Sequence, residues 1–143
     1  MMSTATVASL VFFVFSLTAA AAVEFLMRAF AEEAGVNRWV FAMVPALLSM
    51  LFAMIVYQSS DRKIRQVGQS VSRGILVMLL TWIAFAALIT WTWCQPRQFF
   101  NCLGTTLMVS GVVGGGPMLL SALGAGVLTG VLIIRRPKPR IDE

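Results

Sequence analysis

Four long apolar stretches alternate with short polar segments along this chain of 143 residues. They cover about 4–23, 39–57, 75–93 and 117–134, and each is close to the roughly 20 residues that a helix needs to cross about 30 Å of hydrocarbon. Because these runs are continuous and do not alternate with polar residues, they favour helices over a membrane β-barrel. The pattern therefore predicts an all-α polytopic membrane protein, with four transmembrane helices in a compact bundle.

Composition supports this prediction independently of the pattern. Hydrophobic residues make up 59% of the chain, charged residues only 12%, and the mean hydropathy is +0.86. A soluble domain of this size cannot bury so much apolar surface, whereas in a bilayer lipid covers the outer faces of the helices. No internal repeat is visible, so we expect residues 1–143 to form a single transmembrane domain.

The basic residues predict an orientation. Short segments rich in lysine and arginine stay on the cytoplasmic side of a membrane during insertion. Two segments, an inner loop at 58–74 and a tail at 135–143, hold eight of the eleven basic residues. We therefore expect both termini in the cytoplasm, the connection 94–116 on the outer face, and a bacterial inner (plasma) membrane as the location. The eight residues are Arg62, Lys63, Arg65, Arg73, Arg135, Arg136, Lys138 and Arg140.

These basic residues also bear on partners. They adjoin membrane spans instead of forming a folded face with stacking aromatic residues, so we expect them to contact anionic lipid or a protein partner and no nucleic acid. Within the inner loop, Ile64, Val67, Val71 and Ile75 recur at helical spacing. That spacing fits either a short amphipathic helix on the cytoplasmic leaflet or a solvated connector with a few apolar residues.

Two cysteines, Cys94 and Cys102, lie close together in the outer connection. In an oxidising compartment a disulfide between them would contribute about 2–3 kcal/mol of stability on the chain-entropy estimate. A redox-active pair is the alternative, although membrane proteins that pass electrons between quinones and thiols carry a CxxC and a second cysteine pair. The chain has no histidine, so we expect no metal centre, no cofactor and no catalytic constellation.

Glu24 is the one carboxylate with a chance of lying at membrane depth. Four residues before Arg28, it can form an interfacial ion pair at the outer end of the first span. If that span instead runs from 7 to 27, the carboxylate falls inside hydrocarbon, where ionisable groups usually mark a proton or cation path. Both interpretations remain open from the sequence.

The fourth apolar stretch is unusually long. A straight helix over 105–134 would reach about 45 Å at 1.5 Å per residue, more than one ordinary crossing needs. Its middle holds three glycines and a proline, so we expect a helix break there, a final helix from 117 to 134, and a short outer or re-entrant helix over 105–113. The residues of the expected break are Gly114, Gly115, Gly116 and Pro117.

Small residues recur within that last span at Ala122, Gly126 and Gly130. Their four-residue spacing gives a smooth stripe that lets helices approach closely, either inside the bundle or between copies of the chain. Pro45 removes a backbone donor in the second span, where it predicts a kink that serves packing or a hinge.

These features favour an accessory subunit, or an immunity, exclusion or defence protein, that acts through contacts within the bilayer. Its expected partner is a second membrane protein or a further copy of the chain. A homo-oligomeric channel or small transporter with a glycine-rich fourth helix is the alternative, and an embedded enzyme acting on lipid or quinone is a third class for which no residues can be nominated.

Overall fold

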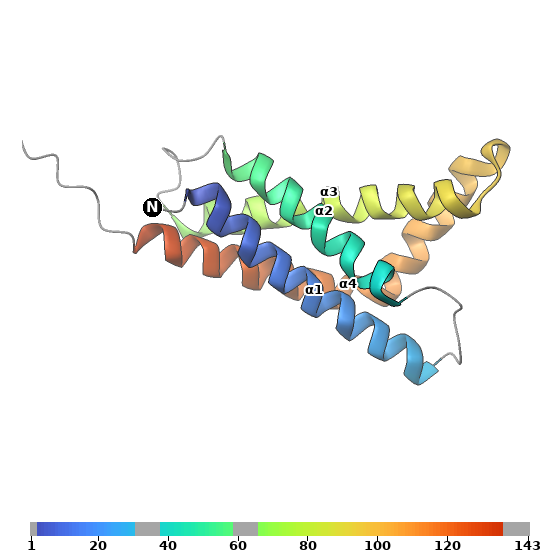
Figure 1. The fold of residues 1–143 in the computed structure, drawn as a ribbon, viewed down its shortest axis with the longest axis horizontal. Coiled ribbons are helices and arrows are strands. Elements are labelled where there is room, and N and C mark those ends of the chain that lie inside the picture. The colour runs from blue at the N-terminus through green and yellow to red at the C-terminus, as the bar shows by residue number, and fades with distance from the viewer. Residues whose placement is uncertain (1–2, 31–37, 59–65, 136–143) are drawn as a thin grey trace, which may run out of the picture.

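The computed structural model describes residues 3–30, 38–58 and 66–135, and in these ranges every regular element is helical. The prediction of an all-α chain is therefore confirmed. Figure 1 shows the arrangement of the helices. The elements are α1 (Thr4–Phe30), α2 (Arg38–Gln58), α3 (Val67–Trp93), the short 3-10 helix η1 (Pro96–Gln98) and α4 (Phe99–Ile134).

The helices form two antiparallel hairpins. α1 packs along α2, and α3 packs along α4, while further contacts join α1 to α4 and α2 to α3. Figure 1 places the start of α1, the end of α2, the start of α3 and the end of α4 together, at what we term the Arg135 end. At the opposite end, termed the Arg97 end because η1 lies there, the two hairpins diverge.

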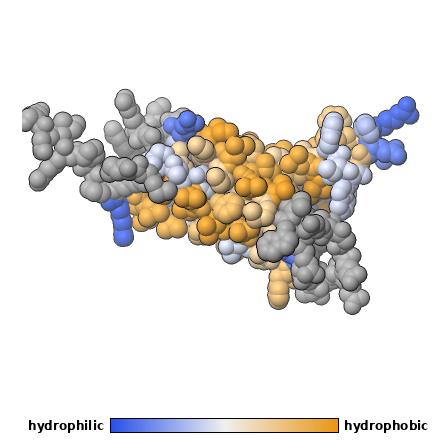
Figure 2. Space-filling model, in the orientation of Figure 1, coloured by the Kyte–Doolittle hydropathy of each residue, from blue (hydrophilic) through white to orange (hydrophobic). Residues whose placement is uncertain are grey.

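Apolar surface covers the helices between these two ends. Figure 2 shows a hydrophobic band with hydrophilic residues gathered at either extremity. Of the described residues, three segments are long and apolar enough to cross a membrane: Thr4–Phe25, Val67–Trp93 and Pro96–Ile134. The apolar part of α2, Ala42–Gln58, is shorter. The chain is accordingly a membrane protein, and the count of four crossings stays a prediction.

α3 begins earlier than the sequence pattern suggested. Residues 67–74, expected in the inner loop or on the cytoplasmic leaflet, form the first two turns of α3. They belong to the bundle because Ser70 and Gly74 are buried there. The inner connection shrinks accordingly, and Arg62, Lys63 and Arg65 lie outside the described residues.

α4 also differs from the expectation, because it does not end at the glycine–proline segment. The helix is continuous over 36 residues with Pro117 inside it, so the expected separate helix over 105–113 is wrong. Figure 1 shows α4 changing direction near its middle. An internal proline removes one backbone donor and presses on the preceding turn, which kinks a helix without necessarily ending it. The kink lets one helix serve both the bundle and the diverging tip.

The stripe of small residues packs inside the molecule, against the first half of α3. A Cβ added at Gly126 would lie 2.9 Å from Cα of Val71, and one added at Gly130 would lie 3.1 Å from Cβ of Ser70. Across the same contact, a Cβ at Gly74 would lie 2.8 Å from the carbonyl oxygen of Ala122. The backbones of α3 and α4 approach this closely only because side chains are missing on both sides.

Candidate functional site: two adjoining cavities

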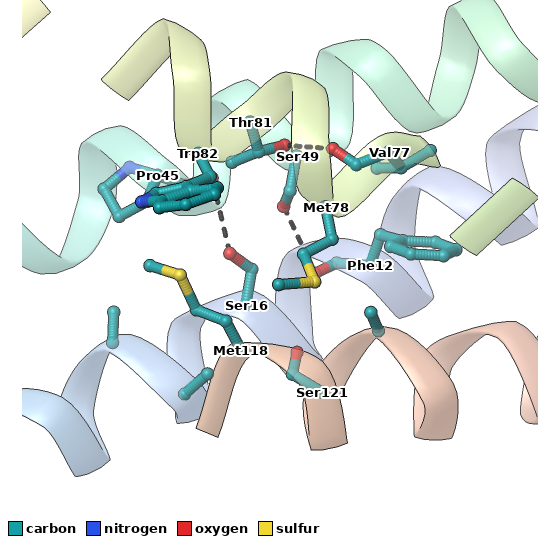
Figure 3. A pocket seen from close by; sticks show the side chains of 13 residues that line it. Phe12, Ser16, Pro45, Ser49, Val77, Met78, Thr81, Trp82, Met118 and Ser121 are labelled. Atoms are coloured by element: carbon teal, nitrogen blue, oxygen red, sulfur yellow. Dashed lines mark hydrogen bonds between the residues drawn. The ribbon is translucent and has the colours of Figure 1, made fainter. Parts of the chain in front are cut away.

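A small cavity lies in the middle of the bundle, where all four long helices meet. Its volume is about 40 Å³, more than the 10–15 Å³ that a single water requires. Figure 3 shows its lining, with the thioethers of Met78 and Met118 facing the same space as several hydroxyls. The lining residues are Phe12, Ser16, Ala19, Ala20, Pro45, Ser49, Val77, Met78, Thr81, Trp82, Met118, Ser121 and Ala122.

Four hydroxyls line this central cavity, one from each long helix. The Ser16 hydroxyl donates to the Pro45 carbonyl over 3.3 Å, and Ser49 donates to the carbonyls of Phe12 at 3.3 Å and Ala46 at 2.9 Å. These two serines tie α1 to α2. Two further hydroxyls belong to Thr81, which donates to a carbonyl within α3, and Ser121 of α4. With their protons directed to carbonyls, the first three leave oxygen lone pairs as acceptors toward the cavity.

A second, larger cavity lies toward the Arg97 end, between α1, α3 and the first half of α4. Its volume is about 320 Å³. Most of its lining is apolar, and its few polar side chains are the hydroxyls of Thr105, Thr106 and Ser110. The full lining comprises Val23, Phe85, Ala86, Ile89, Trp93, Thr105, Thr106, Val109, Ser110, Val113, Gly114 and Met118.

The two cavities adjoin at a defined partition. Met118 lines both of them. Trp82 lines the central cavity, Ser110 lines the outer one, and the indole N–H of Trp82 donates to the Ser110 hydroxyl over 2.8 Å. Ser110 in turn donates to the Thr106 carbonyl at 2.6 Å, which fixes its orientation. A thioether and one hydrogen bond therefore separate a hydroxyl-lined space from an apolar one.

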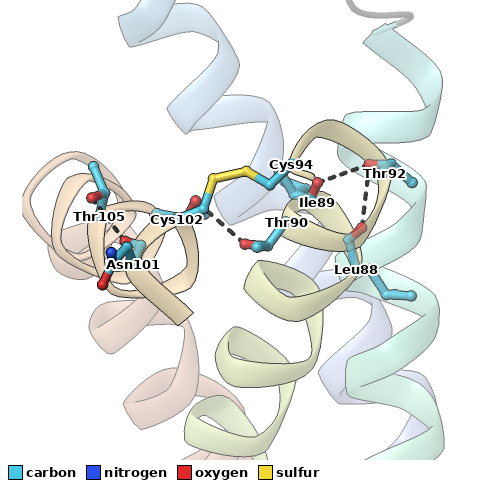
Figure 4. Close-up of a disulfide and its surroundings, with 9 residues drawn as sticks. Leu88, Ile89, Thr90, Thr92, Cys94, Asn101, Cys102 and Thr105 are labelled. Atoms are coloured by element: carbon cyan, nitrogen blue, oxygen red, sulfur yellow. Dashed lines mark hydrogen bonds between the residues drawn. A yellow bond between two sulfur atoms is a disulfide. The ribbon is translucent and has the colours of Figure 1, made fainter. Parts of the chain in front are cut away.

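The cysteine pair closes the tip beyond the outer cavity. The structure brings the sulfur atoms of Cys94 and Cys102 into bonding contact, drawn as a disulfide in Figure 4. Their Cα atoms are 6.6 Å apart, within the range that a disulfide spans. Trp93 and Thr105, which both line the cavity, stand one and three residues from the pair. A bond there would hold the end of α3 beside the start of α4.

Glu24 lines neither cavity. It is partly buried on α1, next to the cavity-lining Val23, and it has an interaction partner of its own. The side chain of Arg28, its predicted partner, lies outside the described residues.

The basic residues divide between the described and undescribed parts of the chain. Arg73 is half-buried near the start of α3, and Arg135 is exposed at the end of α4, both toward the Arg135 end. Arg136, Lys138 and Arg140 lie outside the described residues.

Sequence reasoning missed the residues that build the partition. Ser110 is one of several hydroxyls spread along the apolar helices, and Trp82 and Met118 resemble ordinary lipid-facing or core residues. The signal that unites them is three-dimensional, because residues 82 and 110 lie on different helices. A partly buried indole N–H needs an acceptor, so an acceptor near Trp82 was predictable, although its identity was not.

Comparison with known protein families, with curated proteins and with solved structures found no match for this chain. Functional inference therefore proceeds from the geometry of the helices and the two cavities.

Proposed function

We propose that this chain is a small integral membrane protein that acts through helix contacts with a second membrane protein. It serves as an accessory subunit or as a component of the immunity, exclusion or defence type. In this proposal all four helices cross a bacterial inner membrane, with the Arg135 end in the cytoplasm. The 21 residues of α2 give about 31 Å of helix, which is enough for one crossing.

The observation that carries the proposal is an outward ridge on α4, which we define as Gly104, Met108, Val112, Gly116 and Leu120. The three large side chains of this ridge are 77%, 86% and 72% exposed, in that order. No atom lies within 4 Å of a Cβ placed on either glycine. The ridge thus presents large apolar side chains on either side of bare backbone.

Such a surface suits a partner helix better than it suits lipid. Apolar side chains face lipid without penalty, so association in a bilayer depends on close packing and not on hydrophobic burial. Bare backbone at Gly116, between Val112 and Leu120, lets another helix approach to backbone contact. Residues spaced by four form one inclined ridge, and ridges of this kind cross at about −40° to −50° in right-handed pairs.

The side chains that line the cavities agree with a role in protein–protein contact. Hydroxyls, thioethers and two indoles are the polar side-chain groups among the described residues that line them. None of these groups is an acid or a base near neutral pH. The proposal accordingly assigns the chain no reaction, and its partner supplies any chemistry.

The test is extraction from the native membrane in mild detergent without reductant, followed by the mass of the intact complex. We expect a stoichiometric foreign chain, and loss of that chain in Gly116→Leu because the added side chain covers the bare backbone. Gly68→Leu is the matched control, since Gly68 also has no atom within 4 Å of an added Cβ but lies on α3. A complex that survives Gly116→Leu unchanged contradicts the proposed surface.

A homo-oligomeric channel or small transporter is the second candidate. The observation that favours it is the convergence of Ser16, Ser49, Thr81 and Ser121 on the central cavity. A complex whose mass is a multiple of 15.6 kDa, without any other chain, would support this candidate. Reconstituted protein should then conduct or accumulate ions, and vesicles that stay silent in several lipid compositions would reject it.

A further inference from the structure

The outer cavity opens to the lipid-facing surface of the molecule. Two of its lining residues, Trp93 and Val109, are 71% and 58% exposed. Both lie on helical segments that are long and apolar enough to cross a membrane. In the membrane orientation proposed above, hydrocarbon is the medium beside Val109 at the mouth of this cavity, and an apolar void does not attract water.

The shape of the cavity selects a narrow occupant. Its lining on α4 extends from Thr105 to Met118, a rise of about 20 Å at 1.5 Å per residue. A helix about 10 Å across fills roughly 1,600 Å³ over that length, whereas the whole space between the lining atoms is about 960 Å³. A single hydrocarbon chain fits this slot and a helix does not.

The length also matches the depth of a leaflet. One leaflet contributes about half of the 30 Å hydrocarbon core, and the lining spans slightly more than that. Trp93 and Thr105 mark one end of the slot, on either side of η1, while Gly114 and Met118 mark the other end, where Met118 also lines the central cavity. An occupant would therefore lie along the slot from the membrane interface toward the bilayer centre.

The hydroxyl of Thr106 lies at the end of the slot where the ester group of such a chain would be. Thr106 accepts a hydrogen bond from the Thr90 hydroxyl at 3.4 Å, and its own hydroxyl proton is available to a further acceptor. The hydroxyls of Thr105 and Ser110 are turned to backbone carbonyls of α4. An ester carbonyl is an acceptor only, so it complements the Thr106 hydroxyl.

Met118 stands at the inner end of the slot. Met118 and the Trp82–Ser110 hydrogen bond separate it from the central cavity, as Figure 3 shows from the central side for Met118 and Trp82. A chain that enters from the interface thus ends against the thioether of Met118, which is a good apolar contact. The hydroxyl-lined space beyond remains apart from it.

From this geometry we propose that the outer cavity is a binding site for one acyl chain of a membrane phospholipid, with its ester carbonyl at Thr106 and its methyl end at Met118. The lipid is a structural ligand that fills the slot between the diverging hairpins. It supplies contacts that α1 and α4 would otherwise lack, because the atoms that line an unfilled void lose dispersion energy.

The experiment uses the full chain with Trp39→Phe and Trp91→Phe, so that Trp82 and Trp93 are the remaining tryptophans. The delipidated protein in detergent is titrated with phosphatidylglycerol that carries brominated chains, which quench nearby indoles. We expect quenching that saturates at one lipid per chain. Quenching that rises in proportion to added lipid, with no plateau, overturns the proposal.

Matched glycine variants locate the site. A Cβ at Gly114 lies 3.7 Å from Cε of Met118 and 3.9 Å from a methyl of Val23, so Gly114→Leu has room at its first atom and sends the rest of the side chain into the slot. We expect its affinity for the lipid to fall at least tenfold. Gly116→Leu, two residues away and outside the lining, should bind the lipid like the parent chain.

Equal affinity in the Gly114→Leu variant and the parent overturns the proposal. If Gly114→Leu fails to fold, Val109→Phe replaces it, with Val112→Phe as the control outside the lining. Release of a co-purified protein by added lipid would place a partner at the cavity and would also overturn the lipid assignment. The proposed function is contradicted by a different result, namely a complex with the partner that survives Gly116→Leu. That substitution changes the partner ridge and leaves the slot intact.

Discussion

At the scale of single residues, two glycines of α4 have opposite surroundings. Gly126 faces the backbone of α3 so closely that an added Cβ would lie 2.9 Å from Val71, whereas Gly115 has no atom within 4 Å of an added Cβ. Both occur in one glycine-rich helix, and composition treats them alike. Their structural roles differ because only one of them lies in the contact between α3 and α4.

Gly126→Leu should destabilise the bundle, because the neighbour at 2.9 Å is backbone and cannot rotate away. Overpacking of this kind costs about 1–3 kcal/mol or more, so we expect a clearly lower melting temperature in detergent. Gly115→Leu is the control, and its melting temperature should stay equal or rise, since leucine favours the helix more than glycine does. Equal effects from the two substitutions would show that α3 and α4 do not pack as described.

Residue identity predicted part of the site. The sequence singled out the cysteine pair and the small-residue stripe through their spacing, and of these residues only Ala122 lines a cavity. The hydroxyls were not singled out, because Ser16, Ser49, Thr81 and Ser121 meet only through the packing of four helices. A serine in an apolar helix satisfies its own backbone equally well, so its sequence position does not reveal whether it faces a cavity.

At the scale of elements, α4 and α3 show where sequence reasoning reached its limit. The glycine–proline segment was correctly identified as a disturbance, yet it bends α4 and does not end it. One missing backbone donor is a small loss when the turns on both sides keep their bonds and pack on α3. The start of α3 was misplaced for the related reason that burial of Ser70 and Gly74, invisible in the polar pattern, extends the helix.

The tie between α3 and α4 can be tested through the cysteines. Purified without reductant, the parent chain should be more stable than the Cys94→Ser, Cys102→Ser double variant by about 2–3 kcal/mol, as expected for a disulfide that closes a short loop. Adding reductant should bring the parent down to the level of the variant and leave the variant unchanged. Identical melting of parent and variant before reduction would show that the pair is not bonded.

At the scale of the whole molecule, the alternating direction of the helices determines which helix ends lie at the same extremity. Figure 1 brings the described start of α1 and the end of α4 to the same extremity. From the basic residues the sequence predicts both termini on the cytoplasmic side, and the side of the membrane on which they lie stays a prediction. What charge cannot predict is the divergence of the hairpins, which depends on side-chain packing along each interface.

The proposed orientation is testable with single cysteines in a chain whose native cysteines are replaced by serine. Gln95→Cys, beside η1, should react with a membrane-impermeant maleimide added to intact cells. Arg135→Cys, at the far end of α4, should react only after the membrane is permeabilised. Reaction of both positions from the same side would reject the topology, and reaction in the reverse order would invert it.

The divergence of the two hairpins gives the molecule unequal widths at its two extremities. In the proposed orientation, a wedge of this form occupies more area in the leaflet at the Arg97 end than in the opposite one. Lipids around it must spread in one leaflet and crowd in the other unless the bilayer curves, with the wider end on the convex side. The chain should therefore accumulate where the membrane already bends in that sense, so its shape alone gives it a preference among regions of one continuous membrane.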